Sequence, residues 1–169
     1  SQKEYASAVA DFRRGLELSP RDTGLQYNLS IALLQDKKYA AADSAATELL
    51  QIDPKNKDAY RVLAQSALER KDTITATRQV DTLLAQDSTY IPAYLLRAQI
   101  AAERKDYPTS IRAIDRVLAL DAGDASLYVN RAIMRYHLND LRGAMSDYTE
   151  ALRLEPRDRA ALNNRALLR

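Results

Sequence analysis

The side chains with which proteins perform catalysis are few in this chain and are not grouped along it. His137 is the only histidine, and there is no cysteine, which excludes disulfides, thiolate metal sites and a cysteine nucleophile among these residues. A single histidine for which the sequence supplies no visible set of partners is typical of a solvent-facing side chain. We therefore expect no enzyme activity, no metal and no cofactor.

The carboxylates and the glycines support the same expectation. A catalytic carboxylate pair needs a pocket that drives two pKa values apart, but here the carboxylates lie at predicted helix caps and on polar faces. The glycines are isolated, so the sequence contains no glycine-rich loop that could hold a phosphate; they are Gly15, Gly24, Gly123 and Gly143.

The overall charge is balanced, with 25 Lys and Arg against 23 Asp and Glu and a net charge of +2. Nucleic-acid binding usually needs a clustered basic face, so we expect no nucleic acid as a partner. No run of roughly 18 apolar residues is present, so we expect no direct membrane insertion. The compartment stays open, because a soluble chain of this kind could be cytoplasmic, or periplasmic or exported as part of a longer protein.

Several rows of similar residues recur at a fixed interval of 34 positions. One row of turn residues consists of Pro20, Pro54, Ser88, Ala122 and Pro156. A row of small residues consists of Ser30, Ala64, Ala98, Ala132 and Ala166. A constant period of this length indicates a repeated supersecondary unit, whose copies must stack to bury a shared core.

Each unit contains two predicted helices. In residues 141–154 the apolar side chains recur at i, i+3, i+4 and i+7 and form one stripe of a helix. Residues 125–138 form a second helix, for which Asp124 is a good N-cap. Equivalent caps are Asp22, Asn56 and Asp158, and the other helix of a pair begins after Asp72, Asp106 and Asp140. The connections are only a few residues long, so consecutive helices must pack antiparallel.

These rows resemble the tetratricopeptide repeat, whose period is 34 residues. Tyr128, Ala132, Ala144 and Pro156 fill the bulky, small, alanine and proline positions of that pattern in one repeat. The departures from the pattern are Gln26, Ser88, Ala122, Arg97, Arg131 and Arg165. We expect the turns that lack proline, at positions 88 and 122, to be looser than the others.

The resemblance implies an all-α solenoid of about ten helices, in which antiparallel helix pairs wind into a right-handed superhelix. It predicts a single array over residues 1–169, with whole repeats at 23–56, 57–90, 91–124 and 125–158. Residues 1–22 would supply the second helix of a partial repeat, and residues 159–169 the first helix of another. Because repeat arrays normally close with a polar cap, we expect an excerpt of a longer protein whose uncapped ends fray or form weak homo-oligomers.

The resemblance also implies a non-enzymatic scaffold that binds a partner protein or peptide, of unknown identity, in a concave groove lined by the first helices. By register the groove residues are Tyr27, Asn28, Ile31, Arg61, Gln65, Leu95, Gln99, Asn130, Ile133, His137, Asn163 and Asn164. Apolar positions such as Val62, Leu95 and Val129 have an alternative interpretation, in which they pack between neighbouring first helices. The asparagines are the better candidates, because an exposed asparagine in the middle of a helix gains little for folding.

The same residues bear on other functions. Some members of the family clamp the C-terminal carboxylate of heat-shock chaperones, and Asn130 matches their middle asparagine. Leu95 and Gln99 before it, and Ala160 and Asn164 after it, do not supply the required cations, so we expect no clamp. Self-assembly of the repeats is the alternative function. Binding of single-stranded RNA is disfavoured, because the groove carries Glu69 and Glu103 against Arg61.

Arginines recur at one slot of three successive repeats, as Arg97, Arg131 and Arg165. They could form a basic ladder for an acidic partner. The alternative is that each makes an ion pair with a neighbouring helix while its stem packs, with Asp115 and Asp147 as plausible acceptors.

Overall fold

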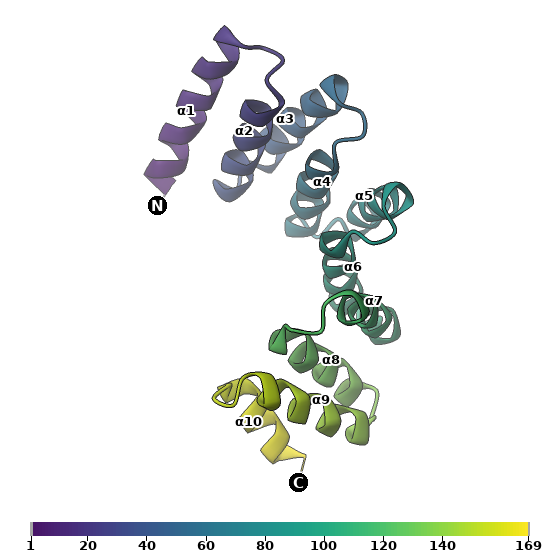
Figure 1. Cartoon of the computed structure of the whole chain (residues 1–169). Coiled ribbons are helices and arrows are strands. Elements are labelled where there is room, and N and C mark those ends of the chain that lie inside the picture. Colours follow the sequence, from purple (N-terminus) through teal and green to yellow (C-terminus); the bar gives the residue numbers. More distant parts are fainter. Residues whose placement is uncertain (1, 169) are drawn as a thin grey trace. The chain divides into compact units, whose positions relative to one another are not determined.

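The structure is a computed structural model that describes residues 2–168, with side chains from Glu4 onward. The described residues form ten α-helices and no strand (Figure 1). Contacts between helices divide the chain into two compact units, Ser1–Tyr90 and Ile91–Arg169. The helices of the first unit are α1 (Gln2–Leu18), α2 (Thr23–Gln35), α3 (Tyr39–Ile52), α4 (Lys57–Glu69) and α5 (Thr73–Gln86). Those of the second are α6 (Ile91–Glu103), α7 (Tyr107–Leu120), α8 (Ala125–His137), α9 (Leu141–Leu154) and α10 (Arg159–Leu167).

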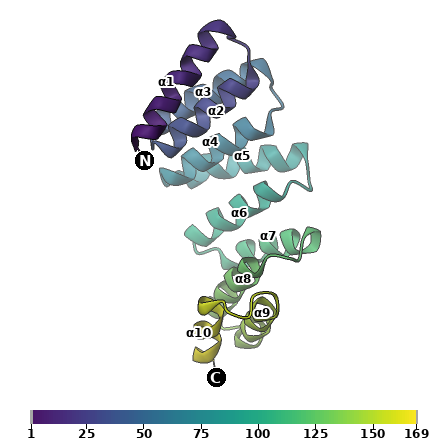
Figure 2. The same cartoon turned by 60° about the vertical axis from the view of Figure 1, so that its left-hand side comes forward.

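In the unit Ser1–Tyr90, helices that follow one another in the chain lie side by side (Figure 2). Leu33 and Leu49 are almost fully buried between α2 and α3, and Phe12 of α1 packs against the same core. The small residues Ala42 and Ala46 of α3 have no exposed surface, so the backbones of the paired helices can approach closely.

In the unit Ile91–Arg169, α7 packs between α6 and α8, and α9 packs between α8 and α10. Ile114 and Val117 of α7 form one part of its core. Ala132 of α8 and Ala144 of α9 are fully buried in the other part. The small residues of the repeat pattern thus lie where paired helices meet, and a larger side chain there would overpack the contact.

Carboxylate and amide caps start most helices, as the sequence predicted. The side chains of Asp22, Asn56, Asp124 and Asp158 accept a hydrogen bond from a backbone N–H in the first turn of the helix that follows. Asp72, Asp106 and Asp140 do the same for α5, α7 and α9. Each such bond satisfies a donor that the helix itself leaves unpaired.

The turn inside each helix pair contains a residue in the left-handed region of the backbone map. These residues are Lys37, Lys71, Lys105 and Asn139, with φ from 58° to 64°. In the turn after α6, the Lys105 N–H bonds to the Ala102 carbonyl and the Asp106 N–H to the Ala101 carbonyl. This is the Schellman arrangement, which usually has glycine at the left-handed position.

Three of the turns between pairs contain an aspartate whose side chain bonds to the backbone of the turn. Oδ1 of Asp53 accepts the N–H of Lys55 at 3.2 Å. Asp87 and Asp121 accept the corresponding N–H two residues on, both at 2.9 Å. The same side-chain bond is therefore present in turns with and without proline at this slot.

Gln26 departs from the bulky residue of the repeat pattern but is buried, with 3% of its surface exposed. Its Nε2 donates to the Ala45 carbonyl at 3.1 Å and to Glu48 Oε2 at 2.7 Å. These two bonds pair the buried amide and join α2 to α3.

Candidate binding clefts on the first helices

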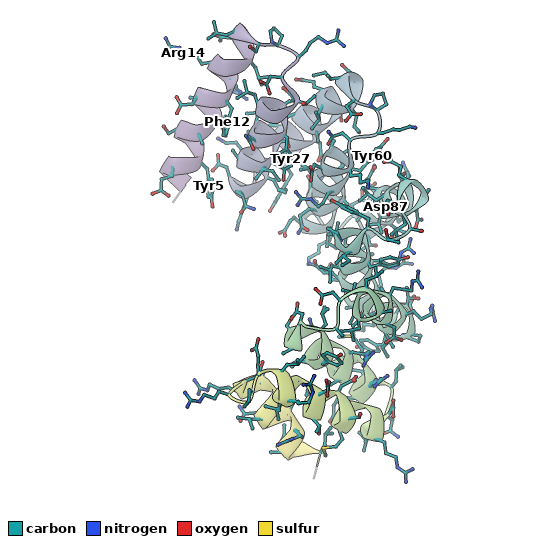
Figure 3. All side chains as sticks on the ribbon, in the orientation of Figure 1. Tyr5, Phe12, Arg14, Tyr27, Tyr60 and Asp87 are labelled. Atoms are coloured by element: carbon teal, nitrogen blue, oxygen red, sulfur yellow. The ribbon has the colours of Figure 1, made fainter. Side chains whose placement is uncertain are left out.

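In the unit Ser1–Tyr90, the predicted groove residues lie on α2 and α4, among them Tyr27 (Figure 3). The Arg61 guanidinium donates a hydrogen bond of 2.5 Å to the Tyr27 hydroxyl and lies 5.9 Å from the centre of the Tyr27 ring. It also pairs with Asp58 at 3.3 Å. Arg61 thus ties α2 to α4, and its charge is largely offset within the fold.

The other predicted groove residues of this unit differ in the exposure and hydrogen bonding of their side chains. The Gln65 amide donates to Glu69 Oε1 at 3.1 Å, so it is partly engaged along its own helix. Ile31 is half-buried, and Asn28 is exposed.

The unit Ile91–Arg169 contains a cleft of about 440 Å³ between α6 and α8, with α7 as its floor. We call it the first cleft. Its lining is mainly apolar, with two amides among the lining side chains, and includes Leu95, Gln99, Ala102, Ile114, Asn130 and Met134. It therefore brings together three residues that the sequence assigned to the groove, namely Leu95, Gln99 and Asn130.

A second cleft, of about 320 Å³, lies between α8 and α10 in the same unit. Its lining includes Ile133, Tyr136, His137, Tyr148, Asn164 and Leu168. All of these except His137 stand 34 positions after a residue of the first cleft. The two clefts are therefore the same structural position in successive repeats, filled by different side chains.

The two clefts differ most in the environment of their asparagines. Tyr148 is only 3% exposed; burial raises the pKa of its hydroxyl, and the Asn164 side chain beside it acts in the opposite direction as a hydrogen-bonding neighbour. Ile114 occupies the equivalent position in the first cleft and offers no hydrogen bond. Asn130 is exposed and bonds to no other side chain that the structure describes. The first cleft is thus roomier and has a free amide, while the amide of the second has the buried Tyr148 hydroxyl as a neighbour.

Three sequence models of the tetratricopeptide repeat match the chain, over residues 1–57, 33–100 and 96–169. Together they cover its whole length. The chain is a tetratricopeptide repeat (TPR) protein. TPR proteins are in general scaffolds for protein–protein interaction without enzyme activity.

Solved structures of TPR proteins share this fold at low sequence identity. MamA 41-end from Desulfovibrio magneticus RS-1 is 18% identical, with a TM-score of 0.80 over 92% of this chain and 88% of that one. A thermophilic TPR protein of Thermus thermophilus is 21% identical, with a TM-score of 0.74 over 97% and 90%. YrrB, described as a TPR protein with an unusual peptide-binding site, is 16% identical, with a TM-score of 0.76 over 97% and 84%. No curated protein sequence matches the chain.

His137 of the TPR protein lies at the end of α8, in an aromatic environment. Its ring stacks on Tyr107, with centroids 4.7 Å apart and planes 8° apart, and meets the edge of the Tyr136 ring at 6.0 Å. The side chain is exposed. No three His, Cys, Asp or Glu side chains of the described residues are grouped as metal ligands would be.

The apolar groove positions divide between the two interpretations that the sequence left open. Val62 and Val129 are buried, so they pack within the fold. Leu95 is 41% exposed and faces the first cleft. Asn163 is exposed but lines neither cleft.

Arg131 makes the ion pairs that the sequence suggested. It binds Asp115 at 2.5 Å and Asp147 at 2.7 Å, and Arg135 joins Asp147 at 2.9 Å. Asp147 is 3% exposed, so Arg131 is committed to a buried network between helices and does not belong to an open basic ladder.

Sequence reasoning missed the residues that decide the shape of the first cleft. Ala102 and Ile114 lie where the second cleft has Tyr136 and Tyr148. Comparing residues 34 positions apart would have found this difference in size.

None of the described helices is long and apolar enough to cross a membrane.

Proposed function

We propose that this TPR protein binds an extended segment of a partner protein in the first cleft, between α6 and α8. The observation that carries the proposal is the free amide of Asn130 beside an unfilled apolar cleft. An asparagine amide both donates and accepts hydrogen bonds, as the N–H and C=O groups of an extended peptide require. The cleft offers a place for one of its side chains.

The chemistry of the lining supports a peptide rather than a small polar ligand. Leu95 and Met134 offer apolar surface above the buried Ile114, and burying one aliphatic side chain there contributes roughly 1.5–3 kcal/mol. Each hydrogen bond from Asn130 or Gln99 adds roughly 0.5–1.5 kcal/mol. Because association costs several kcal/mol in lost freedom, one cleft alone should bind weakly, with a Kd on the order of 0.1–1 mM.

Two comparisons are consistent with this proposal. The family as a whole consists of protein-interaction scaffolds. YrrB, which shares the fold, is described as having a peptide-binding site.

A random heptapeptide library displayed on phage tests the proposal, with the whole chain as bait. Ile114→Tyr should fill the first cleft and give Asn130 the partner that Tyr148 gives Asn164, and Asn130→Ala removes the free amide. We expect the selected peptides to bind both variants at least fivefold more weakly than the wild type. Asn163→Ala is the matched control, because Asn163 is exposed and lines neither cleft.

One result of this experiment would overturn the proposal. If the selected peptides bind the Ile114→Tyr variant as tightly as the wild type, they occupy another surface. Circular dichroism of each variant must show an unchanged helical spectrum for the comparison to count.

Self-assembly is the second candidate function, and it is supported by apolar side chains on α10. Leu162 and Leu167 are 42% and 83% exposed. Burying such side chains against another copy would contribute roughly 1.5–3 kcal/mol each. Sedimentation velocity over a concentration series should then show weak association that Leu167→Gln reduces, whereas a monomer at every concentration would exclude this function for the chain.

A further inference from the structure

One end of the first cleft carries a negative charge. Asp124 is the only ionisable side chain in the lining, and no basic residue lines the cleft. Its Oδ1 accepts the Ser126 N–H at 2.9 Å as the N-cap of α8, which leaves Oδ2 for another donor. No Lys or Arg among the described residues pairs with this carboxylate.

The turn that contains Asp124 also differs in charge from the other turns between repeats. Residues 121–124 read Asp, Ala, Gly, Asp, with two carboxylates and no cation. The slot of Gly123 holds a basic residue in three of the other turns, namely Arg21, Lys55 and Arg157. In the remaining turn, Lys57 already binds Asp87 at 2.6 Å. A cation for the acidic turn beside the first cleft is therefore not supplied from within the described chain.

We propose that the ligand of the first cleft is a peptide segment in which a lysine or arginine neighbours an aliphatic side chain. The aliphatic side chain packs against Leu95 and Met134, and the cation lies beside Asp124. This inference rests on the proposed function, since it specifies the peptide that the same cleft prefers.

The charges predict both the size and the salt dependence of this preference. A solvent-exposed ion pair contributes roughly 0.2–1 kcal/mol, so a lysine beside the anchor should tighten binding about two- to fivefold over a neutral residue. A glutamate at the same place should weaken binding by a similar factor. Because surface charges are screened over about 10 Å at 0.1 M salt and about 3 Å at 1 M, the preference should disappear at high ionic strength.

A set of acetylated, amidated heptapeptides tests the inference, each with leucine at its centre. The peptides differ at one position, directly before or directly after the leucine, which holds lysine, norleucine or glutamate. Their affinities for the whole chain are measured by chemical-shift titration. Asp124→Asn removes the charge but keeps the cap, because asparagine caps helices as well as aspartate does. We expect this variant to bind lysine and norleucine peptides equally.

Gly123→Lys is an independent second variant, because it supplies the cation that Lys55 supplies in the equivalent turn. Gly123 has no positive φ, and an added Cβ would meet one atom closely, Oδ1 of the exposed Asp121 side chain at 3.2 Å, which must shift by a few tenths of an ångström. We expect Gly123→Lys to reduce the preference for lysine as Asp124→Asn does, with an unchanged thermal midpoint.

The outcomes separate this inference from the proposed function. If the leucine peptides bind at the first cleft but lysine, norleucine and glutamate are equivalent, the charge preference is overturned and the peptide site stands. A preference for lysine that persists in Asp124→Asn overturns it as well. If no peptide of the set binds, the proposed function and this inference both fall.

Discussion

Replacing Asn130 and Asn164 separately by alanine should have unequal effects on folding, although the two residues are equivalent by position. Asn164 has the buried Tyr148 hydroxyl as a hydrogen-bonding neighbour, whereas Asn130 faces solvent beside Ile114. Asn164→Ala should therefore lower the free energy of unfolding, and Asn130→Ala should leave it nearly unchanged.

The expected difference follows from the hydrogen bond and from burial. Losing the bond costs roughly 0.5–1.5 kcal/mol, and leaving the buried Tyr148 hydroxyl unpaired raises the total toward roughly 1–3 kcal/mol. Alanine favours helix over asparagine at both positions by a few tenths of a kcal/mol, and this gain cancels in the comparison. In a unit of this size, a loss of about 1 kcal/mol lowers the thermal midpoint by about 4–8 °C.

Urea denaturation followed by circular dichroism measures both variants, together with Tyr148→Phe and the double variant Asn164→Ala with Tyr148→Phe. The double-mutant cycle should give a coupling energy of about 1 kcal/mol between Asn164 and Tyr148. Equal midpoints for Asn130→Ala and Asn164→Ala, or a coupling energy near zero, would refute the assignment of one amide to the fold and one to the cleft.

Three further predictions concern residues outside the clefts. Lys105→Gly should stabilise the protein by about 0.5–1 kcal/mol in urea denaturation, because Lys105 has φ 59° and glycine adopts this conformation without a steric penalty. Asp147→Asn should destabilise it by about 3 kcal/mol in the same assay, since a buried carboxylate that pairs with Arg131 at 2.7 Å is lost. For Asp87, the hydrogen bond from Lys57 is the largest cause that lowers its pKa, from 3.8 to about 2. The bond therefore stabilises the fold above pH 3.8, and this contribution should be lost as the pH falls toward 2, which urea midpoints between pH 5 and pH 2 will show.

Each of these predictions has a control within the chain. Lys55→Gly, in a turn without positive φ, should not stabilise; equal gains at Lys55 and Lys105 would contradict the strain argument. Asp115→Asn should cost under about 1 kcal/mol, because the Asp115 side chain is 45% exposed; a loss as large as that of Asp147→Asn would show that burial is not the cause. Asp87→Asn should flatten the acid dependence, and an unchanged profile would show that another carboxylate is responsible.

The helices and their borders could be read from the sequence, because they depend on local chemistry. Asp124 and its equivalents cap helices through a bond to a backbone N–H in the next turn, which needs no distant partner. Alanines such as Ala132 lie at the contact between paired helices. They could be recognised because a repeat of 34 residues places equivalent residues on the same face of equivalent helices, against the same neighbouring helix. The pairing of Arg131 with Asp115 and Asp147 was also foreseen, since all three lie on helices that the repeat places together.

The turns show where sequence reasoning stopped. The row of turn residues was described by its prolines, whereas Asp53, Asp87 and Asp121 make the side-chain bonds in three of the turns. These aspartates recur at the same period of 34 residues and were visible in the sequence.

The sequence by itself determined the repeat, the helix pairs and the rows of small residues that let them pack. Only the tertiary structure decided which of the equivalent side chains are free. Asn130 and Asn164 have the same residue type and the same register, but one faces Ile114 across a cleft and the other has Tyr148 as a hydrogen-bonding neighbour. Arg61, a candidate ligand group by position, is occupied by Tyr27 and Asp58. The physical reason is that a helical period determines which face a side chain is on, whereas its availability depends on the size and hydrogen-bonding groups of residues that lie on other helices.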